Sequence, residues 1–152
     1  MNRPIAQRIL GVLLMMFSAT MLLPMAIGVF YGDETWLLFV KSFSLILATG
    51  AAFWYPVRNF RKELGLRDGF LVVAAFWMVL GSAGSLPFFL ADVLSMSFTD
   101  SVFESMSGLT TTGATVLTGL DTLPRSILFY RQQLQWFGGM GIIVLAVAVM
   151  PM

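Results

Sequence analysis

Residues 97–115 of this chain read SFTDSVFESMSGLTTTGAT, and they carry the strongest information about its architecture. The stretch is too short and too polar to cross a bilayer, which takes about 20 apolar residues in a helix. Its first part is nevertheless periodic, because apolar residues recur on one helical face: Phe98, Val102, Met106 and Leu109. The following residues, 110–115, are β-branched or small and disfavour a helix. The stretch therefore predicts a short helix over 97–109, followed by extended backbone over 110–115.

This arrangement is typical of a pore helix with an ion filter. A helix over 97–109 would be about 20 Å long, enough to enter a hydrocarbon core of about 30 Å only partway. It would point the negative end of its dipole, near Leu109, toward the membrane centre. A filter needs successive carbonyls turned to one axis, and Gly113 can adopt the positive φ that this often requires. A polar extracellular loop preceded by a surface helix is the alternative interpretation.

Apolar stretches of membrane-spanning length surround this segment. The chain is 58% hydrophobic and only 11% charged, whereas a soluble domain is about a quarter charged. The stretches cover residues 9–30, 36–57, 69–90 and 127–152. A signal peptide is the alternative for the first one, but the apolar part of a signal peptide is only about 7 to 15 residues long. The predicted fold class is an all-α integral membrane protein.

The basic residues predict how the chain is oriented. Residues 58–68 hold four Lys or Arg, and Arg3 and Arg8 precede the first apolar stretch. Since cytoplasmic segments of membrane proteins are enriched in Lys and Arg, we expect the N-terminus and the 58–68 loop in the cytoplasm. Residues 1–66 would then form an accessory transmembrane hairpin. Residues 67–152 would form a repeat of helix 69–90, pore helix 97–109, filter 110–115 and helix 127–152.

Glycine-rich stretches predict close helix packing. Residues 81–85 make one side of the third span small, so another helix should pack there, and Pro87 should bend or end that span. Residues 138–141 superficially resemble a phosphate-binding loop, but no soluble strand precedes them. Packing against the pore helix is their predicted role.

Composition argues against several kinds of function. The chain has no cysteine and no histidine, which removes thiolate nucleophiles, imidazole bases and the usual zinc ligands. Its net charge of +1 provides no basic surface for nucleic acid. We therefore expect no catalytic residues, no cofactor site and no nucleic-acid partner, and we expect membrane lipid as the surroundings.

Acidic residues are the remaining candidates for a functional role. Glu104 could attract cations or hydrogen-bond neighbouring backbone and hydroxyl groups, because an acid within a membrane is a functional candidate. A capping role is its alternative: Ser97 with Asp100, or Ser101 with Glu104, has capping-box spacing. Three aspartates could make an outer vestibule negative, although solvated loop charge is the simpler interpretation: Asp92, Asp100 and Asp121.

Residues 103–115 and 135–142, which read FESMSGLTTTGAT and QWFGGMGI, resemble the first pore repeat of bacterial Trk-type potassium uptake proteins of the Trk/Ktr/HKT superfamily. The resemblance implies four linked repeats of helix, pore helix, filter strand and helix, with two helices before them. It implies a potassium filter at Thr111 and Thr112, flanked by Thr110, Gly113 and Ala114. No Tyr-Gly follows Gly113, so the number of ion sites stays open.

The resemblance also implies partners and location. Family members are homodimers of the bacterial cytoplasmic membrane and bind a cytoplasmic ring of nucleotide-binding regulatory subunits. One filter loop supplies carbonyls from one side only, so several copies must surround an ion. No polar flank follows the last apolar residues, and we expect this chain to be the N-terminal part of a longer four-repeat protein.

Functions of other classes remain as alternatives. A secondary transporter could bind Na⁺ or a small solute at the unwound segment 110–115. A membrane enzyme could use Glu104 with Asp100 as a carboxylate pair, since four residues separate them on one helical face. A non-conducting membrane subunit would need no filter, so its function would survive replacement of Gly113.

Overall fold

The computed structural model describes residues 3–59 and 66–149, and within these ranges every regular element is helical. In chain order the elements are α1 (Arg3–Thr20), α2 (Leu22–Tyr31), α3 (Trp36–Trp54), η1 (Tyr55–Val57), α4 (Leu66–Gly84), α5 (Leu86–Leu90), η2 (Asp92–Leu94), α6 (Phe98–Leu109), η3 (Leu120–Thr122) and α7 (Arg125–Val149). Most of the predicted basic loop, 58–68, and the last residues of the predicted span 127–152 lie outside the described residues. The predicted all-α class is confirmed for the part of the chain that the structure describes.

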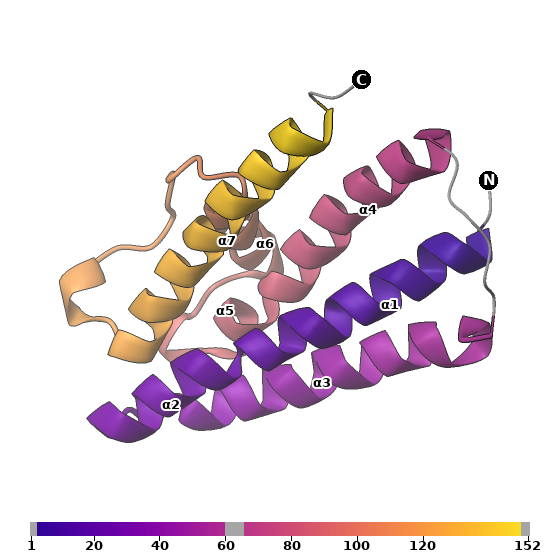
Figure 1. Ribbon diagram of the computed structural model, residues 1–152. Helices are drawn as coiled ribbons and strands as arrows, with labels where there is room; N and C mark the ends of the chain where they lie inside the picture. The colour runs from indigo at the N-terminus through magenta and orange to yellow at the C-terminus, as the bar shows by residue number, and fades with distance from the viewer. Residues whose placement is uncertain (1–2, 60–65, 150–152) are drawn as a thin grey trace.

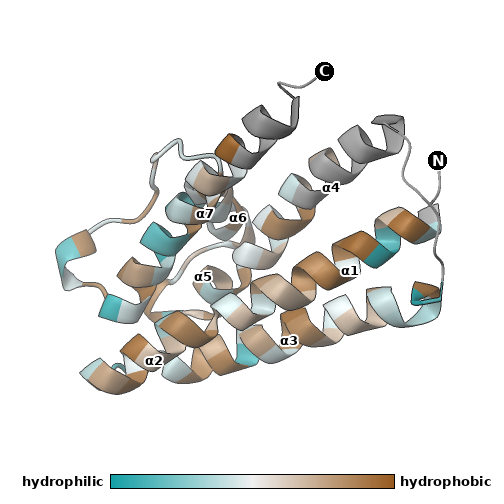
Figure 2. Ribbon diagram, in the orientation of Figure 1, coloured by the Kyte–Doolittle hydropathy of each residue, from teal (hydrophilic) through white to brown (hydrophobic). Residues whose placement is uncertain are grey.

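Two helical stretches among the described residues are long and apolar enough to cross a membrane. They cover Pro4–Tyr31 and Trp36–Val57, with mean hydropathies of 2.1 and 1.7. Figure 2 shows hydrophobic residues along most of α1, α2 and α3. A shorter apolar stretch covers Trp77–Leu90. Large apolar side chains on these helices are exposed, as expected for a surface that faces lipid.

Prolines divide two of the predicted spans. The stretch predicted over 9–30 is interrupted at Met21, between α1 and α2, and the stretch predicted over 69–90 is interrupted at Ser85, between α4 and α5. In each case a proline stands shortly after the break, Pro24 in α2 and Pro87 in α5. A proline has no N–H for the carbonyl four residues before it, so each break leaves backbone groups that another element must satisfy.

The N-terminal hairpin, which we define as α1, α2 and α3, is held by close contact of two glycines. A Cβ added at Gly11 would lie 2.9 Å from the carbonyl oxygen of Gly50, and a Cβ added at Gly50 would lie 2.9 Å from that of Gly11. Only hydrogen fits at either position, so the backbones of α1 and α3 approach directly. Figure 1 shows these helices side by side, with α4 on the other side of α1.

The second half of the chain packs around α6. This helix contacts α4, α5 and α7. A Cβ added at Gly81 would collide with the side chain of Met106, and one at Gly84 would collide with the hydroxyl of Ser105. The prediction that another helix packs closely on the small side of residues 81–85 is therefore confirmed.

An aromatic cluster joins the two halves. The ring of Tyr130 in α7 lies 5.6 Å from that of Phe39 in α3 and 5.2 Å from that of Phe88 in α5, measured between centroids. All three side chains are buried. Helix α7 is thus in contact with the N-terminal hairpin and with the elements around α6.

Candidate functional site

Helix α6 begins at a side-chain cap. The hydroxyl of Ser97 accepts a hydrogen bond from the backbone N–H of Asp100 at 3.1 Å and donates to the Asp100 carboxylate at 2.7 Å. Of the two predicted capping pairs, the structure therefore contains Ser97 with Asp100. The helix runs from Phe98 to Leu109, which agrees with the prediction of 97–109.

The buried face of α6 is small and polar. Its buried residues are Ser101, Glu104, Ser105, Ser107, Gly108 and Leu109. The aromatic residues Phe98 and Phe103 are instead 61% and 45% exposed. Serine and glycine on the inner face let the backbone of α6 approach α4 and α7 closely.

The chain leaves the helix through a tight reversal after Leu109. The N–H of Thr111 donates to the carbonyl of Gly108 and the N–H of Thr112 donates to that of Ser107, both at 3.0 Å. Two residues in this reversal have positive φ, Thr111 at 56° and Gly113 at 76°. The expected positive φ at Gly113 is confirmed, whereas the positive φ at the β-branched Thr111 is a strained conformation that the sequence did not indicate.

Free carbonyl oxygens follow this reversal. Residues 110–116 are exposed. The carbonyl of Ala114 accepts a hydrogen bond from the Ser107 hydroxyl at 2.6 Å. The carbonyls of Thr111, Thr112 and Gly113 accept no hydrogen bond from any donor in residues 3–59 and 66–149. Consecutive unpaired carbonyls next to the C-terminal end of a helix form a surface that favours a cation.

Glu104 holds the far end of this segment. Its side chain is 1% exposed. Its carboxylate oxygens lie 3.0 and 2.9 Å from the hydroxyl of Thr115, and one of them accepts the backbone N–H of Val116 at 3.1 Å. The same hydroxyl of Thr115 accepts the N–H of Leu117 at 3.0 Å. The hydrogen bonding to nearby backbone and hydroxyl groups that was considered for Glu104 is therefore present.

Arg131 of α7 completes this network. Its Nε donates to Oε1 of Glu104 at 2.6 Å, and its side chain is 10% exposed. This pair was not among the predictions from sequence. A useful signal was available, because an arginine near the start of a largely apolar helix needs a partner, and Glu104 is an acid in the adjacent short helix.

The other acidic residues do not converge with Glu104. The carboxylate of Asp100 bonds to Ser97, whereas that of Glu104 bonds to the 115–116 backbone region and to α7, so the two acids have separate partners. Asp92 and Asp121 are exposed in η2 and η3. Within the described ranges no group of three or more acidic residues is placed to hold a metal ion.

Gly138 brings α7 against the end of α6. A Cβ added at this glycine would overlap the carbonyl oxygen of Leu109, the last residue of α6. The predicted packing of residues 138–141 against the short helix that ends at Leu109 is confirmed at this contact. At Gly141 an added Cβ would lie 3.3 Å from the ring of Trp77 in α4.

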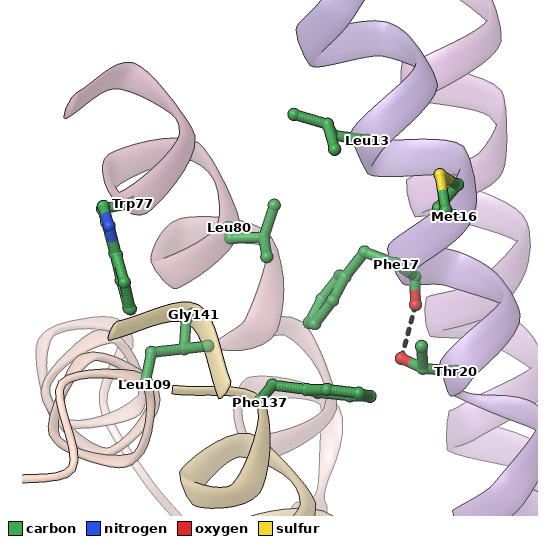
Figure 3. A pocket seen from close by; sticks show the side chains of 9 residues that line it. All are labelled: Leu13, Met16, Phe17, Thr20, Trp77, Leu80, Leu109, Phe137 and Gly141. Carbon is green, nitrogen blue, oxygen red and sulfur yellow. Dashed lines mark hydrogen bonds between the residues drawn. The ribbon is translucent and has the colours of Figure 1, made fainter. Parts of the chain in front are cut away.

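An apolar cavity lies beside the end of α6, and its volume is about 240 Å³. Figure 3 shows Leu109, Phe137, Trp77, Leu80 and Phe17 around it. The hydroxyl of Thr20, also in its lining, donates to the Phe17 carbonyl at 2.6 Å. Walls of this kind do not replace the hydration shell of an ion, so segment 110–114 is the stronger candidate for ion binding.

A family model, curated relatives and a solved structure all match this chain to the same family, TrkH. Residues 37–152 match the TrkH family, described as a cation transport protein. The chain is 59% identical over 144 residues to the Trk system potassium uptake protein TrkH of Halomonas elongata and 54% identical to that of Escherichia coli K12, with 95% of this chain covered in both cases. The crystal structure of the potassium transporter TrkH from Vibrio parahaemolyticus superimposes with a TM-score of 0.95 at 57% identity. This match covers 100% of our chain and 32% of that one, and the chain spans 30% of the length of both curated relatives.

Proposed function

The chain belongs to the TrkH family of cation transport proteins, and from that premise we propose that it forms the first repeat of a pore that conducts potassium across the membrane. In this proposal the backbone oxygens of Thr111 and Thr112 contribute to the potassium filter, with Thr110, Gly113 and Ala114 flanking them. Relatives named as potassium uptake proteins at 54–59% identity support potassium as the transported ion.

The observation that carries the proposal is the set of unpaired carbonyls at Thr111, Thr112 and Gly113. Within the membrane an unpaired backbone carbonyl is costly unless it lines an aqueous cavity or meets a ligand. A potassium ion can be that ligand, because carbonyl oxygens can replace its water shell. The C-terminus of α6 adds the negative end of a helix dipole next to these oxygens.

The same proposal divides the chain into two functional parts. Residues 1–66 are an accessory hairpin and residues 67–152 are one repeat, from which carbonyls reach the ion on one side only. Three further repeats would complete the ring. The length of the relatives supports this arrangement, because this chain corresponds to only 30% of each.

Location and partners complete the proposal. We place the protein in the bacterial cytoplasmic membrane with its N-terminus inside, because the basic residues that flank the first two apolar stretches, Arg3, Arg8 and the four in 58–68, are of the kind that is enriched in cytoplasmic segments. We also propose that the full-length protein is a homodimer that binds a cytoplasmic nucleotide-binding regulatory subunit. The relatives' description as parts of a Trk system supports more than one component.

The test is potassium flux into proteoliposomes from a chimera in which this chain replaces the matching segment of the V. parahaemolyticus transporter. The agreement of the two backbones makes such a replacement practical. The matched samples are this chain alone, the intact V. parahaemolyticus protein and the chimera carrying Gly113→Asp.

We expect flux from the intact transporter and from the chimera, and loss of flux with Gly113→Asp. Flux from this chain alone would contradict the single-chain arrangement and would indicate assembly of identical copies. A folded chimera without flux, beside an active intact transporter, would contradict the conducting role. Unchanged flux and selectivity with Gly113→Asp would contradict the assignment of the filter.

A further inference from the structure

Gln133 of α7 bonds to the broken end of α1. Its side-chain Nε2 donates to the carbonyl of Thr20 at 3.0 Å. This carbonyl would bond to the N–H of residue 24 in a continuous helix, but residue 24 is a proline and has no N–H. The break in α1 therefore exposes an acceptor, and α7 supplies its donor.

The side chain of Gln133 also buries an oxygen atom that has no hydrogen-bond partner among the described residues. Gln133 is 6% exposed, and within the described part of the chain its Oε1 has no hydrogen-bond partner. A half-satisfied amide contributes little net stability, because the gain of one hydrogen bond is offset by burial of the unpaired oxygen. The clearest consequence of Gln133 is geometric, since its bond ties α7 to the C-terminal end of α1.

A second pair of contacts ties the hairpin to the start of α7. The carboxylate of Asp33 accepts the backbone N–H of Ser126 at 3.1 Å, and the hydroxyls of Thr35 and Ser126 are 2.6 Å apart. Asp33 and Thr35 belong to the turn between α2 and α3. An acidic group at the first turn of a helix also interacts favourably with its dipole.

These contacts lie along one face of α7. Ser126, Tyr130 and Gln133 are separated by four and three residues, the spacing of neighbours on a helix surface. Tyr130 packs its ring on Phe39 of α3 in the middle of this face. The N-terminal hairpin therefore holds α7 at both ends of a stretch of two turns.

A second face of α7 contacts α6 and, through Glu104, is connected to the backbone at 115–116. Arg131 bonds to Glu104, and Gly138 packs on the carbonyl of Leu109. Leu134, between them, contacts Gly108, where an added Cβ would lie 3.0 Å from the leucine Cβ. A displacement of α7 would move Arg131 and with it the carboxylate that anchors Thr115 and Val116.

We propose that the N-terminal hairpin is a positioning element for the filter and acts through α7, with Gln133 as the positioning residue. The inference rests on the proposed function, because it concerns the geometry of the same filter. It assigns the accessory helices a part in ion selectivity, in addition to anchoring the chain in lipid.

The test compares Gln133→Leu with Gln132→Leu in the chimera described above. Gln132 is the adjacent residue in α7 and is exposed, so the same substitution there serves as a matched control. The readouts are the ratio of potassium to sodium flux in proteoliposomes and the midpoint of thermal unfolding in detergent. Asp33→Ala, in the turn at the other end of the contact face, removes the acceptor of the Ser126 N–H and is a second variant that keeps the test valid if Gln133→Leu does not fold.

We expect Gln133→Leu and Asp33→Ala each to lower the potassium to sodium ratio about threefold or more, the scale of one hydrogen bond. Gln132→Leu should keep the ratio of the unmodified chimera, and unfolding midpoints should stay close together. Unchanged ratios in the folded Gln133→Leu and Asp33→Ala variants would overturn the positioning role while leaving the assignment of the filter intact. An unmodified chimera that conducts nothing would overturn the proposed function and this inference together.

Discussion

The Nε of Arg131 lies 2.6 Å from Oε1 of Glu104, so a buried ion pair links α7 to α6 at the point where Glu104 also holds Thr115 and Val116. Both groups are removed from water, and each offsets the charge of the other. The carboxylate can therefore fix the backbone beyond the proposed filter without adding net charge next to it.

Arg131→Gln should destabilise the protein strongly, because it leaves the Glu104 carboxylate buried without a cation. Removal of one partner of a buried pair costs about 3 to 5 kcal/mol. We expect a lower midpoint of thermal unfolding and reduced potassium flux in the chimera. The double variant Glu104→Gln with Arg131→Gln should recover part of the stability, since no charge is then buried alone. Wild-type stability of Arg131→Gln would show that the pair contributes nothing.

Gly113→Ala should alter selectivity more than stability. The φ of Gly113 is 76°, and an added Cβ would meet nothing within 4 Å, so the expected cost is backbone strain of about 1 to 2 kcal/mol. Gly32→Ala is the matched control, because Gly32 has a φ of 70° and equal space but lies in the α2–α3 turn. Flux measurements should give a lower potassium to sodium ratio for Gly113→Ala only. Equal ratios in both variants would argue against a filter at Gly113.

Gly138→Ala should separate α7 from α6, because the added methyl group overlaps the carbonyl of Leu109. Overpacking of this kind typically costs about 1 to 3 kcal/mol. Gly139→Ala, one residue further, meets nothing within 4 Å and should be neutral or slightly stabilising, since alanine favours a helix over glycine by about 1 kcal/mol. Thermal unfolding of the two variants is the measurement. The opposite order of stability would contradict the packing described here.

Ser107→Ala should loosen the segment at Ala114. Its hydroxyl donates to the Ala114 carbonyl at 2.6 Å, and loss of such a bond costs about 1 kcal/mol. Ser101→Ala is the comparison, because the Ser101 hydroxyl donates to the Ser97 carbonyl, which already accepts the Ser101 N–H within the helix. We expect a change in ion selectivity for Ser107→Ala and wild-type selectivity for Ser101→Ala. A shift of selectivity with Ser101→Ala alone would refute this account of the anchoring.

Features with a local cause were predictable from the sequence. The cap at Ser97 and the periodicity after it gave the bounds of α6 nearly to the residue. The positive φ at Gly113 followed from the conformational freedom of glycine, and the contact at Gly138 followed from small residues in an apolar helix. Each signal lies within a few residues of the structure that it specifies.

Features that depend on a distant partner were not predictable. The ion pair of Arg131 with Glu104 was not predicted, because the two residues are far apart in the sequence and only the packing of α7 on α6 brings them together. The break at Met21 was not predicted either, since a proline in an apolar helix is tolerated where a neighbouring helix satisfies the freed carbonyl. The donor to that carbonyl is Gln133, more than a hundred residues further along the chain. The break at Ser85, by contrast, agrees with the prediction that Pro87 bends or ends its span.

The inward face of α6 consists mostly of serine and glycine, while Phe98 and Phe103 face outward. In a deep mutational scan, tolerance along this helix should therefore follow side-chain volume instead of hydrophobicity. Conservative-looking changes such as Ser105→Val would be harmful because no space exists beside Gly84, whereas a polar residue at Phe98 would be accepted within this repeat. Substitution scores that reward apolar residues in membrane helices would rank these variants in the wrong order.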